Sequence, residues 1–253
     1  RSTMSPSPQG NNSAVFGVVL QSRNKLSVIG TAFAVSDKLA ISAWRNFTEN
    51  FFQTGDIVYL CKQVFRGMVF KSSPQVFVRE NDSIEDWVVL ELTSGDFSCH
   101  VTLCKEEELP TDEYPVDSHG ATISIGKEVG VRYFPCGLIY FSGQVAIRSL
   151  FGKIYNYSPL HTGTKYSDQL ILADSFPTAI HAALNIRVGR DLCSGGAPYF
   201  GENGKVLAFH VSSFNDAATS AMKSSSGHSN VSYCAGHVLC RLPNFAAKYD
   251  NLF

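Results

Sequence analysis

The sequence has no excess of charge of either sign, because 21 lysines and arginines stand against 22 aspartates and glutamates. A strongly basic surface for nucleic acid or for an anionic membrane is therefore not predicted. Long hydrophobic runs are also missing: apolar stretches such as residues 14–20 are far shorter than the roughly 20 residues that span a bilayer. No signal-peptide pattern opens the chain. We expect neither nucleic acid nor a membrane as a partner.

Regular cysteine motifs are absent as well. The seven cysteines are an odd number without even spacing, and none forms a Cys-x-x-Cys pair or a zinc-finger pattern with histidine. No metal site and no cofactor is predicted. Irregular cysteines of this kind are typical of reduced thiols, so we expect an intracellular protein of the cytoplasm or nucleus. The oligomeric state stays open.

Short β segments dominate what is present. Hydrophobic residues make up 44% of the chain and charged residues 17%, which is enough apolar material for a sizeable core. Six candidate strands separated by turn residues fall within about 80 residues, a spacing typical of a sandwich or barrel. They are residues 15–20, 26–35, 39–44, 57–65, 75–79 and 87–92.

A second strand-rich half follows a charged, proline-interrupted segment at 105–113. We therefore expect an all-β protein of two six-stranded antiparallel β-barrels joined by a crossover. The predicted organisation is a disordered arm at 1–13, an N-terminal barrel at 14–94, a crossover at 95–120, a C-terminal barrel at 121–246 and a tail at 247–253.

Residues 191–200 read Asp-Leu-Cys-Ser-Gly-Gly-Ala-Pro-Tyr-Phe, an uncommon way to enter a strand. Two glycines directly after Ser194 permit strained backbone and the close approach of another chain segment. A nucleophile needs such a site, where its hydroxyl and nearby backbone N–H groups face the same point. A plain Gly-rich turn between two strands explains the tripeptide alone equally well.

Three segments occur in order: residues 30–46 with the run Leu-Ala-Ile-Ser-Ala-Trp-Arg-Asn, residues 86–92 with Asp-Trp-Val-Val-Leu-Glu-Leu, and Ser194-Gly195-Gly196. Together they resemble the chymotrypsin/trypsin-like serine proteases, over roughly residues 14–245. The resemblance implies that Ser194 is the nucleophile and Asp86 the acid that orients the base. Asp86 also reads as an ordinary turn former before an apolar strand.

The base position departs from this family, because Arg45 stands where the resemblance implies histidine. A guanidinium has no acceptor and a pKa above about 12, so it cannot serve as a base. It can instead form a charge-assisted pair with a carboxylate. Our hypothesis is that Arg45 forms a salt bridge with Asp86 and fills the place of the imidazole. Asn46 likewise lacks the cysteine that often follows the histidine in secreted members.

The resemblance also assigns binding positions. The oxyanion hole maps to Leu192, Cys193 and Ser194, although the family usually has glycine at the first of these. The substrate pocket maps to Val188, His210, Val211 and Ser212. A histidine at position 210 is similar to that of viral and glutamyl-specific members, where it hydrogen-bonds a Glu or Gln side chain. A satisfied strand histidine is the alternative. Cys193 is a second candidate nucleophile.

Three functions remain open from the sequence. The first is a catalytically impaired protease homologue that binds a protein or peptide. The second is an active serine endopeptidase whose base lies elsewhere or whose natural histidine is replaced by Arg45. This candidate includes a preference for Glu or Gln through His210. The third is a β-barrel interaction module that shares only Gly-rich turns. Six further histidines are candidates for a base elsewhere: His100, His119, His161, His181, His228 and His237.

Overall fold

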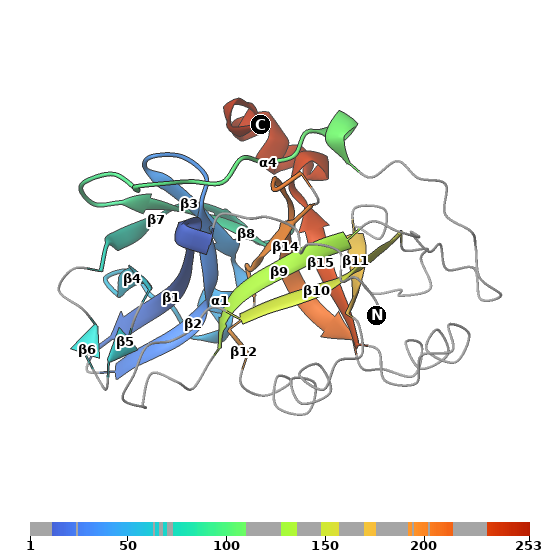
Figure 1. The fold of residues 1–253 in the computed structure, drawn as a ribbon. Helices are drawn as coiled ribbons and strands as arrows, with labels where there is room; N and C mark the ends of the chain where they lie inside the picture. Colours follow the sequence, from blue (N-terminus) through green and yellow to red (C-terminus); the bar gives the residue numbers. More distant parts are fainter. Residues whose placement is uncertain are drawn as a thin grey trace.

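Two β-sheets lie side by side in this computed structural model (Figure 1), the first built from the N-terminal part of the chain and the second from the C-terminal part. The described residues are 12–23, 25–62, 64–65, 68–69, 73–109, 128–135, 148–156, 170–175, 192–193, 195–201, 203–214 and 232–253. No helix among these residues has the length and apolar character needed to cross a membrane.

The first sheet is a closed barrel of six antiparallel strands in the order β1-β2-β3-β8-β7-β4. This confirms the predicted N-terminal barrel strand by strand. A two-stranded excursion, β5 (Val64–Phe65) and β6 (Met68–Val69), follows β4. The barrel strands are β1 (Val15–Ser22), β2 (Lys25–Ala34), β3 (Leu39–Ala43), β4 (Ile57–Cys61), β7 (Gln75–Asp82) and β8 (Trp87–Leu92).

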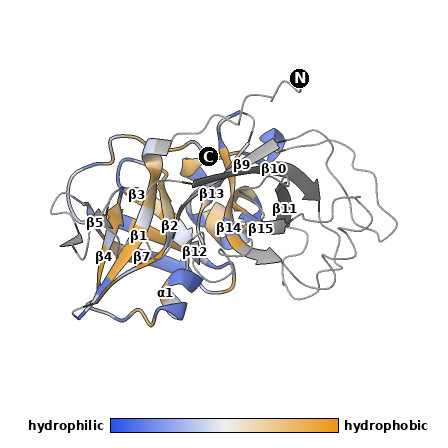
Figure 2. Ribbon diagram, turned by 60° about the horizontal axis from the view of Figure 1, so that its bottom comes forward, coloured by the Kyte–Doolittle hydropathy of each residue, from blue (hydrophilic) through white to orange (hydrophobic). Residues whose placement is uncertain are grey.

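Burial along these strands shows which of them are covered on both faces. In β7 the exposed and covered residues alternate for most of its length, as expected for a strand with one face in water. In β1 six consecutive residues are buried, and β3 and β8 are also buried almost throughout. Figure 2 shows hydrophobic residues along β1 and β4, while α1 at the barrel edge is hydrophilic. The covered strands are those beside the functional residues described below.

The second sheet has seven strands in the order β10-β11-β15-β14-β13-β9-β12, and β9 also pairs with β10. The all-β prediction is therefore confirmed. If β12 is set aside, the strands of this sheet follow the same relative order as those of the first barrel. They are β9 (Glu128–Pro135), β10 (Arg148–Asn156), β11 (Leu170–Ser175), β12 (Leu192–Cys193), β13 (Pro198–Phe200), β14 (Val206–Phe214) and β15 (Ser232–Val238).

The C-terminal segment packs back onto the first barrel. After the 3-10 turn Leu239–Arg241, α4 (Pro243–Lys248) and a second 3-10 turn, Asp250–Leu252, follow. The rings of Phe245 and Tyr249 lie 5.6 and 6.0 Å from that of Trp87 in β8. The predicted boundary between residues 246 and 247 thus falls inside α4, and the expected tail is packed structure. At the crossover, Arg241 forms a salt bridge with Glu106 in the 3-10 turn Glu106–Glu108.

The five-residue helix α1 (Arg45–Glu49) ends in an unusual way. The Phe52 N–H donates to the Phe47 carbonyl (3.0 Å) and the Phe51 N–H donates to the Thr48 carbonyl (3.2 Å). This pair of bonds is the Schellman motif, which places one residue in the left-handed region and favours glycine there. Here that residue is Phe51, with φ 56° and a side chain that is 84% exposed. A bulky residue in this conformation carries strain of about 1 kcal/mol.

The substitution Phe51→Gly is therefore expected to stabilise the fold. Relief of the left-handed strain exceeds the entropy that glycine adds to the unfolded chain, so the free energy of unfolding should rise by about 0.5–1 kcal/mol. Urea denaturation measures this, with Phe51→Ala as the control that removes the ring but keeps the strain. A Phe51→Gly variant less stable than the Phe51→Ala variant would contradict the assignment.

Candidate active site

Arg45 and Asp86 meet because two paired strands end at the same place. Strand β3 pairs antiparallel with β8, with Ala43 opposite Trp87. Arg45 follows the end of β3 and Asp86 precedes the start of β8, and the Trp44 N–H donates to the Asp86 carbonyl at 3.0 Å. The register of one strand pair thus places the two side chains together at the barrel edge.

The contact between them is a salt bridge with two hydrogen bonds. The backbone N–H of Arg45 donates to Asp86 Oδ1 at 2.8 Å, and its Nε donates to Asp86 Oδ2. The Arg45 side chain is 38% exposed and that of Asp86 is 11% exposed. Both carboxylate oxygens of Asp86 are therefore occupied by one residue. The expected pairing of Arg45 with Asp86 is present.

Arg45 also reaches the second sheet. Its Nη1 donates to the backbone carbonyl of Val211 in β14 at 2.7 Å. The guanidinium thus connects the turn before β8 to a strand from the other half of the chain. A neutral imidazole has a single N–H donor, whereas a guanidinium has five in one plane, so only the guanidinium donates to Asp86 and to Val211 without an added proton.

Asp86 itself has a left-handed backbone, with φ 60°. Aspartate tolerates this region better than most residues, and such conformations persist where surrounding contacts hold them. The preceding residue supplies those contacts. Glu85 is buried, with 2% of the residue exposed. Its carboxylate accepts from the indole Nε1 of Trp87 (2.8 Å) and from the backbone N–H of Asn244 (2.7 Å) at the start of α4. The C-terminal helix therefore helps to fix the turn that carries Asp86.

The Gly195-Gly196 turn docks directly on the first barrel. The Gly195 carbonyl accepts from the Thr31 N–H at 3.0 Å, and the Gly196 N–H donates to the His210 carbonyl at 2.8 Å. Gly196 has φ 83°, and a Cβ there would lie 2.4 Å from the Thr31 carbonyl oxygen and 2.5 Å from Ser42 Oγ. No other residue type fits this position, so the second glycine of the Ser-Gly-Gly sequence is required by close packing.

Asn46 is a site residue whose role the sequence did not predict. Its only noted feature was that it replaces the cysteine of secreted members. Its Nδ2 donates to the Gly195 carbonyl at 2.8 Å and to Ser42 Oγ at 3.2 Å. A Cβ on Gly30 would lie 2.0 Å from Nδ2, and one on Gly195 would lie 2.3 Å from Oδ1. The buried amide therefore fills a space between two glycines and ties α1 to the turn after Ser194. The available signal was an amide beside Arg45 together with glycines at 30 and 195.

The remaining predicted residues divide into two groups. Ser194 and Val188 lie outside the described residues. Leu192 and Cys193 form β12, whose backbone pairs with Pro135 and Phe134 of β9. Ser212 lies in β14 beside Val211. Their assignment to the nucleophile, oxyanion hole and substrate pocket stays a prediction.

His210, for which the sequence left open a ligand contact or a satisfied strand position, is buried at 5% exposure. Its Nδ1 lies 2.8 Å from the Tyr199 hydroxyl, and the two rings stack with centroids 6.0 Å apart. Burial, with a smaller contribution from the nearby Arg45 charge, lowers the pKa of His210 to about 3. The imidazole is therefore neutral at physiological pH.

His237 in β15 lies next to the Asp86 turn. Its Nδ1 is 2.7 Å from the Glu85 carbonyl oxygen, which can only accept, so the ring proton is on Nδ1. Burial lowers the pKa of His237, although the Glu85 carbonyl and the Asp86 charge oppose this. His100 lies elsewhere, 3.6 Å from Asp37. His119, His161, His181 and His228 lie outside the described residues.

Within the described part of the chain, no group of three or more His, Cys, Asp or Glu side chains is arranged to hold a metal ion. The arrangement around Asp86 is instead an arginine–carboxylate pair at the contact of two sheets, beside a glycine turn and two buried histidines.

The sequence matches no protein-family model and no curated protein. Among solved structures, it is similar to the apo crystal structure of the MamO protease domain from Magnetospirillum magneticum, with a TM-score of 0.51. The similarity covers 88% of this chain and 90% of that domain at 12% sequence identity. This chain has the fold of a trypsin-like protease domain. At such low identity the similarity establishes the fold and no activity, because one fold hosts many functions.

The two buried histidines predict an acid-sensitive fold. Each binds a proton in the unfolded chain below a pKa of about 6.5, whereas folded His210 stays neutral down to about pH 3. Stability is therefore fully present above about pH 6.5 and falls as the pH drops below it. The expected loss is about 1.4 kcal/mol per pH unit for His210.

Urea denaturation at several pH values between about 7 and 5 measures this slope. In the variant His210→Phe, the dependence of unfolding free energy on pH should become shallower by about 1.4 kcal/mol per pH unit, whatever its absolute stability. The control Phe77→Ala, at an exposed residue that carries no titratable group, should leave the slope unchanged. An unaltered slope in His210→Phe would show that His210 is not held neutral by the fold.

Proposed function

We propose that this chain is a chymotrypsin-like serine protease homologue that lacks efficient peptidase activity and binds a protein or peptide. The observation that carries the proposal is the position of Arg45. Its guanidinium donates to Asp86 Oδ2 and to the Val211 carbonyl, and its backbone N–H donates to Asp86 Oδ1, at the point where the resemblance implies the general base. Because a guanidinium accepts no proton, a serine beside it stays a poor nucleophile.

The size of the expected defect follows from catalytic triads in general. Removing the histidine of a comparable triad reduces turnover by about 10⁶-fold, which corresponds to roughly 8 kcal/mol of transition-state stabilisation. Arg45 also adds a positive charge next to the position where the imidazolium would form. Substrate binding alone does not restore a turnover reduced this far. Binding of a protein or peptide is therefore the role that we propose.

The proposal includes a second closed barrel. The support is that β9 pairs with both β10 and β13, and that the strand order of the second sheet repeats that of the first. It also includes Ser194 at the nucleophile position, supported by the Gly195-Gly196 turn docked 3.0 Å from the Thr31 N–H. The intracellular location rests on the cysteine pattern of the sequence.

An active serine endopeptidase is the second candidate, and the observation that favours it is His237. Burial lowers the pKa of this histidine, its Nδ1 faces the Glu85 carbonyl oxygen, and it lies next to the turn that holds Asp86. Because Nδ1 donates to that carbonyl, Nε2 is the ring nitrogen that can accept a proton, although the side chain is buried. A Glu or Gln preference through His210 belongs to this candidate.

A fluorophosphonate probe, which labels activated serines, separates the two. Wild type should show only background labelling, whereas Arg45→His should become labelled at Ser194, because the imidazole regains Asp86 as its orienting partner. Labelling should disappear in Arg45→His/Ser194→Ala. Two controls should stay unlabelled: Arg45→Gln, which removes the charge without adding a base, and Arg79→His, which places a histidine elsewhere on the barrel.

Strong labelling of wild type at Ser194, abolished by His237→Gln, would replace the proposal with the active enzyme. If Arg45→His folds with a cooperative unfolding transition and still does not label, the triad-like geometry itself is refuted. Alkylation of wild type by iodoacetamide at Cys193 with matching loss of any hydrolysis would assign the nucleophile to the thiol instead.

A further inference from the structure

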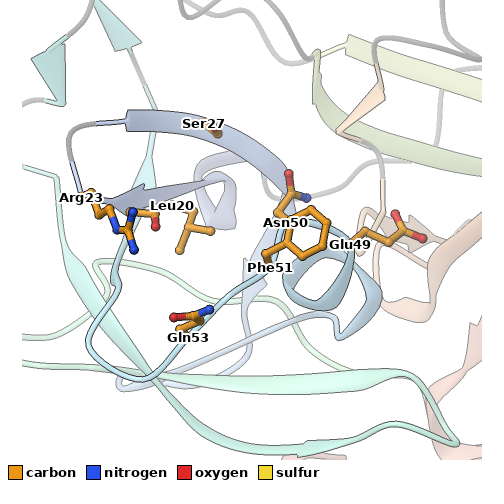
Figure 3. A pocket seen from close by; sticks show the side chains of 8 residues that line it. Leu20, Arg23, Ser27, Glu49, Asn50, Phe51 and Gln53 are labelled. Carbon is orange, nitrogen blue, oxygen red and sulfur yellow. The ribbon is translucent and has the colours of Figure 1, made fainter.

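A pocket of about 390 Å³ lies on the first barrel, between the β1–β2 hairpin and the end of α1 (Figure 3). One wall is the β1–β2 hairpin, with Leu20, Arg23 and Ser27, and the other is the end of α1 and the loop after it, with Glu49, Phe51 and Gln53. Ligand pockets are commonly on the order of 300–1,000 Å³, so this one suits a few residues of a chain.

Stability alone would favour glycine at position 51 of this pocket, yet the residue there is phenylalanine. Its ring is 84% exposed, and its backbone occupies the left-handed position that the helix end reserves for glycine. The neighbouring rings of Trp44, Phe47 and Phe52 pack on one another within 5.3–6.3 Å. Phe51 has no such ring contact within the described part of the chain. An exposed aromatic ring beside a pocket is typical of a binding anchor.

Two charged side chains flank this ring. Figure 3 shows Arg23 at one end of the pocket and Glu49 at the other, with the ring of Phe51 between them. Among the residues that the structure describes, neither side chain has a salt-bridge or hydrogen-bond partner. Both charges are thus available to a ligand. The pocket complements a ligand with an apolar centre, an acidic end and a basic end.

The pocket is also within reach of the Arg45 site. Arg45 begins α1 and Glu49 ends it, so the helix separates them by roughly 6–8 Å. Two to three residues of an extended peptide, at about 3.3 Å each, cover this distance. A peptide held near Arg45 is therefore long enough to reach the Phe51 pocket.

We propose that this pocket binds an extended peptide segment in which an apolar side chain packs on Phe51, an acidic side chain pairs with Arg23 and a basic side chain pairs with Glu49. The inference rests on the proposed peptide-binding function and names the chemistry of the bound segment. Side chains of an extended peptide share a face at every second residue. The acidic, apolar and basic residues should accordingly stand at alternate positions.

Three fluorescein-labelled peptides with blocked ends test this by fluorescence anisotropy: Asp-Gly-Leu-Gly-Lys, its reverse Lys-Gly-Leu-Gly-Asp, and the neutral Asn-Gly-Leu-Gly-Gln. One charged peptide should bind wild type at least about tenfold more tightly than the other two. The double reversal Arg23→Glu/Glu49→Arg should transfer that preference to the peptide of opposite order.

The ring is tested separately. Phe51→Gly and Phe51→Ala should each weaken the preferred peptide by about tenfold or more, and Phe51→Trp should retain binding. Because Phe51→Gly is expected to be more stable than wild type, unfolding cannot explain its loss. Phe77→Ala is the matched control, since Phe77 is an exposed ring on β7 that does not line the pocket, and it should bind like wild type.

Binding of all three peptides within about twofold of one another, or binding unaffected by loss of the Phe51 ring, overturns the inference. So does an absence of binding by every probe. A displayed peptide library separates this failure from that of the proposed function. Selected peptides whose binding survives Phe51→Ala but is lost in Arg45→Gln overturn the pocket alone, whereas a library that yields no binder overturns the peptide-binding function itself.

Discussion

The arginine–carboxylate contact between Arg45 and Asp86 is the interaction on which the arrangement of the site depends. It uses the backbone and the side chain of one residue to occupy both oxygens of the other, and it extends to the Val211 carbonyl in the second sheet. Burial is the main cause of the lowered pKa values of His210 and His237 nearby, and the Arg45 charge adds a smaller contribution in the same direction.

Packing around this contact reinforces it from two directions. From the second half of the chain, the Gly195-Gly196 turn comes so close to Thr31 and Ser42 that only glycine fits at 196, and the Asn46 amide fills the remaining gap. From the C-terminus, the buried Glu85 carboxylate binds backbone N–H groups of α4 and fixes the turn that gives Asp86 its left-handed backbone. Charges buried in this way are retained because each has hydrogen-bond partners.

Local patterns in the sequence were enough to predict the barrel strands and the pairing of Arg45 with Asp86, because strand periodicity and the order of three segments are readable along the chain. The role of Asn46 was not predictable, since its partners Gly30 and Gly195 are distant in sequence and matter only through close approach. The packed C-terminal helix was missed because α4 is too short for a periodic signal, and its stability comes from Trp87 and Glu85. For His210, the sequence left open whether it faces a ligand, and its burial against Tyr199 is a tertiary feature.

The central claim is tested most directly by the Nε–H resonance of Arg45 in an NMR spectrum of the wild-type protein, assigned by comparison with Arg45→Lys. We predict a resolved Nε–H signal that is protected from exchange with water and that loses this protection in Asp86→Asn. A signal that exchanges as fast as those of the solvent-exposed arginines, and that is unchanged in Asp86→Asn, would contradict the account.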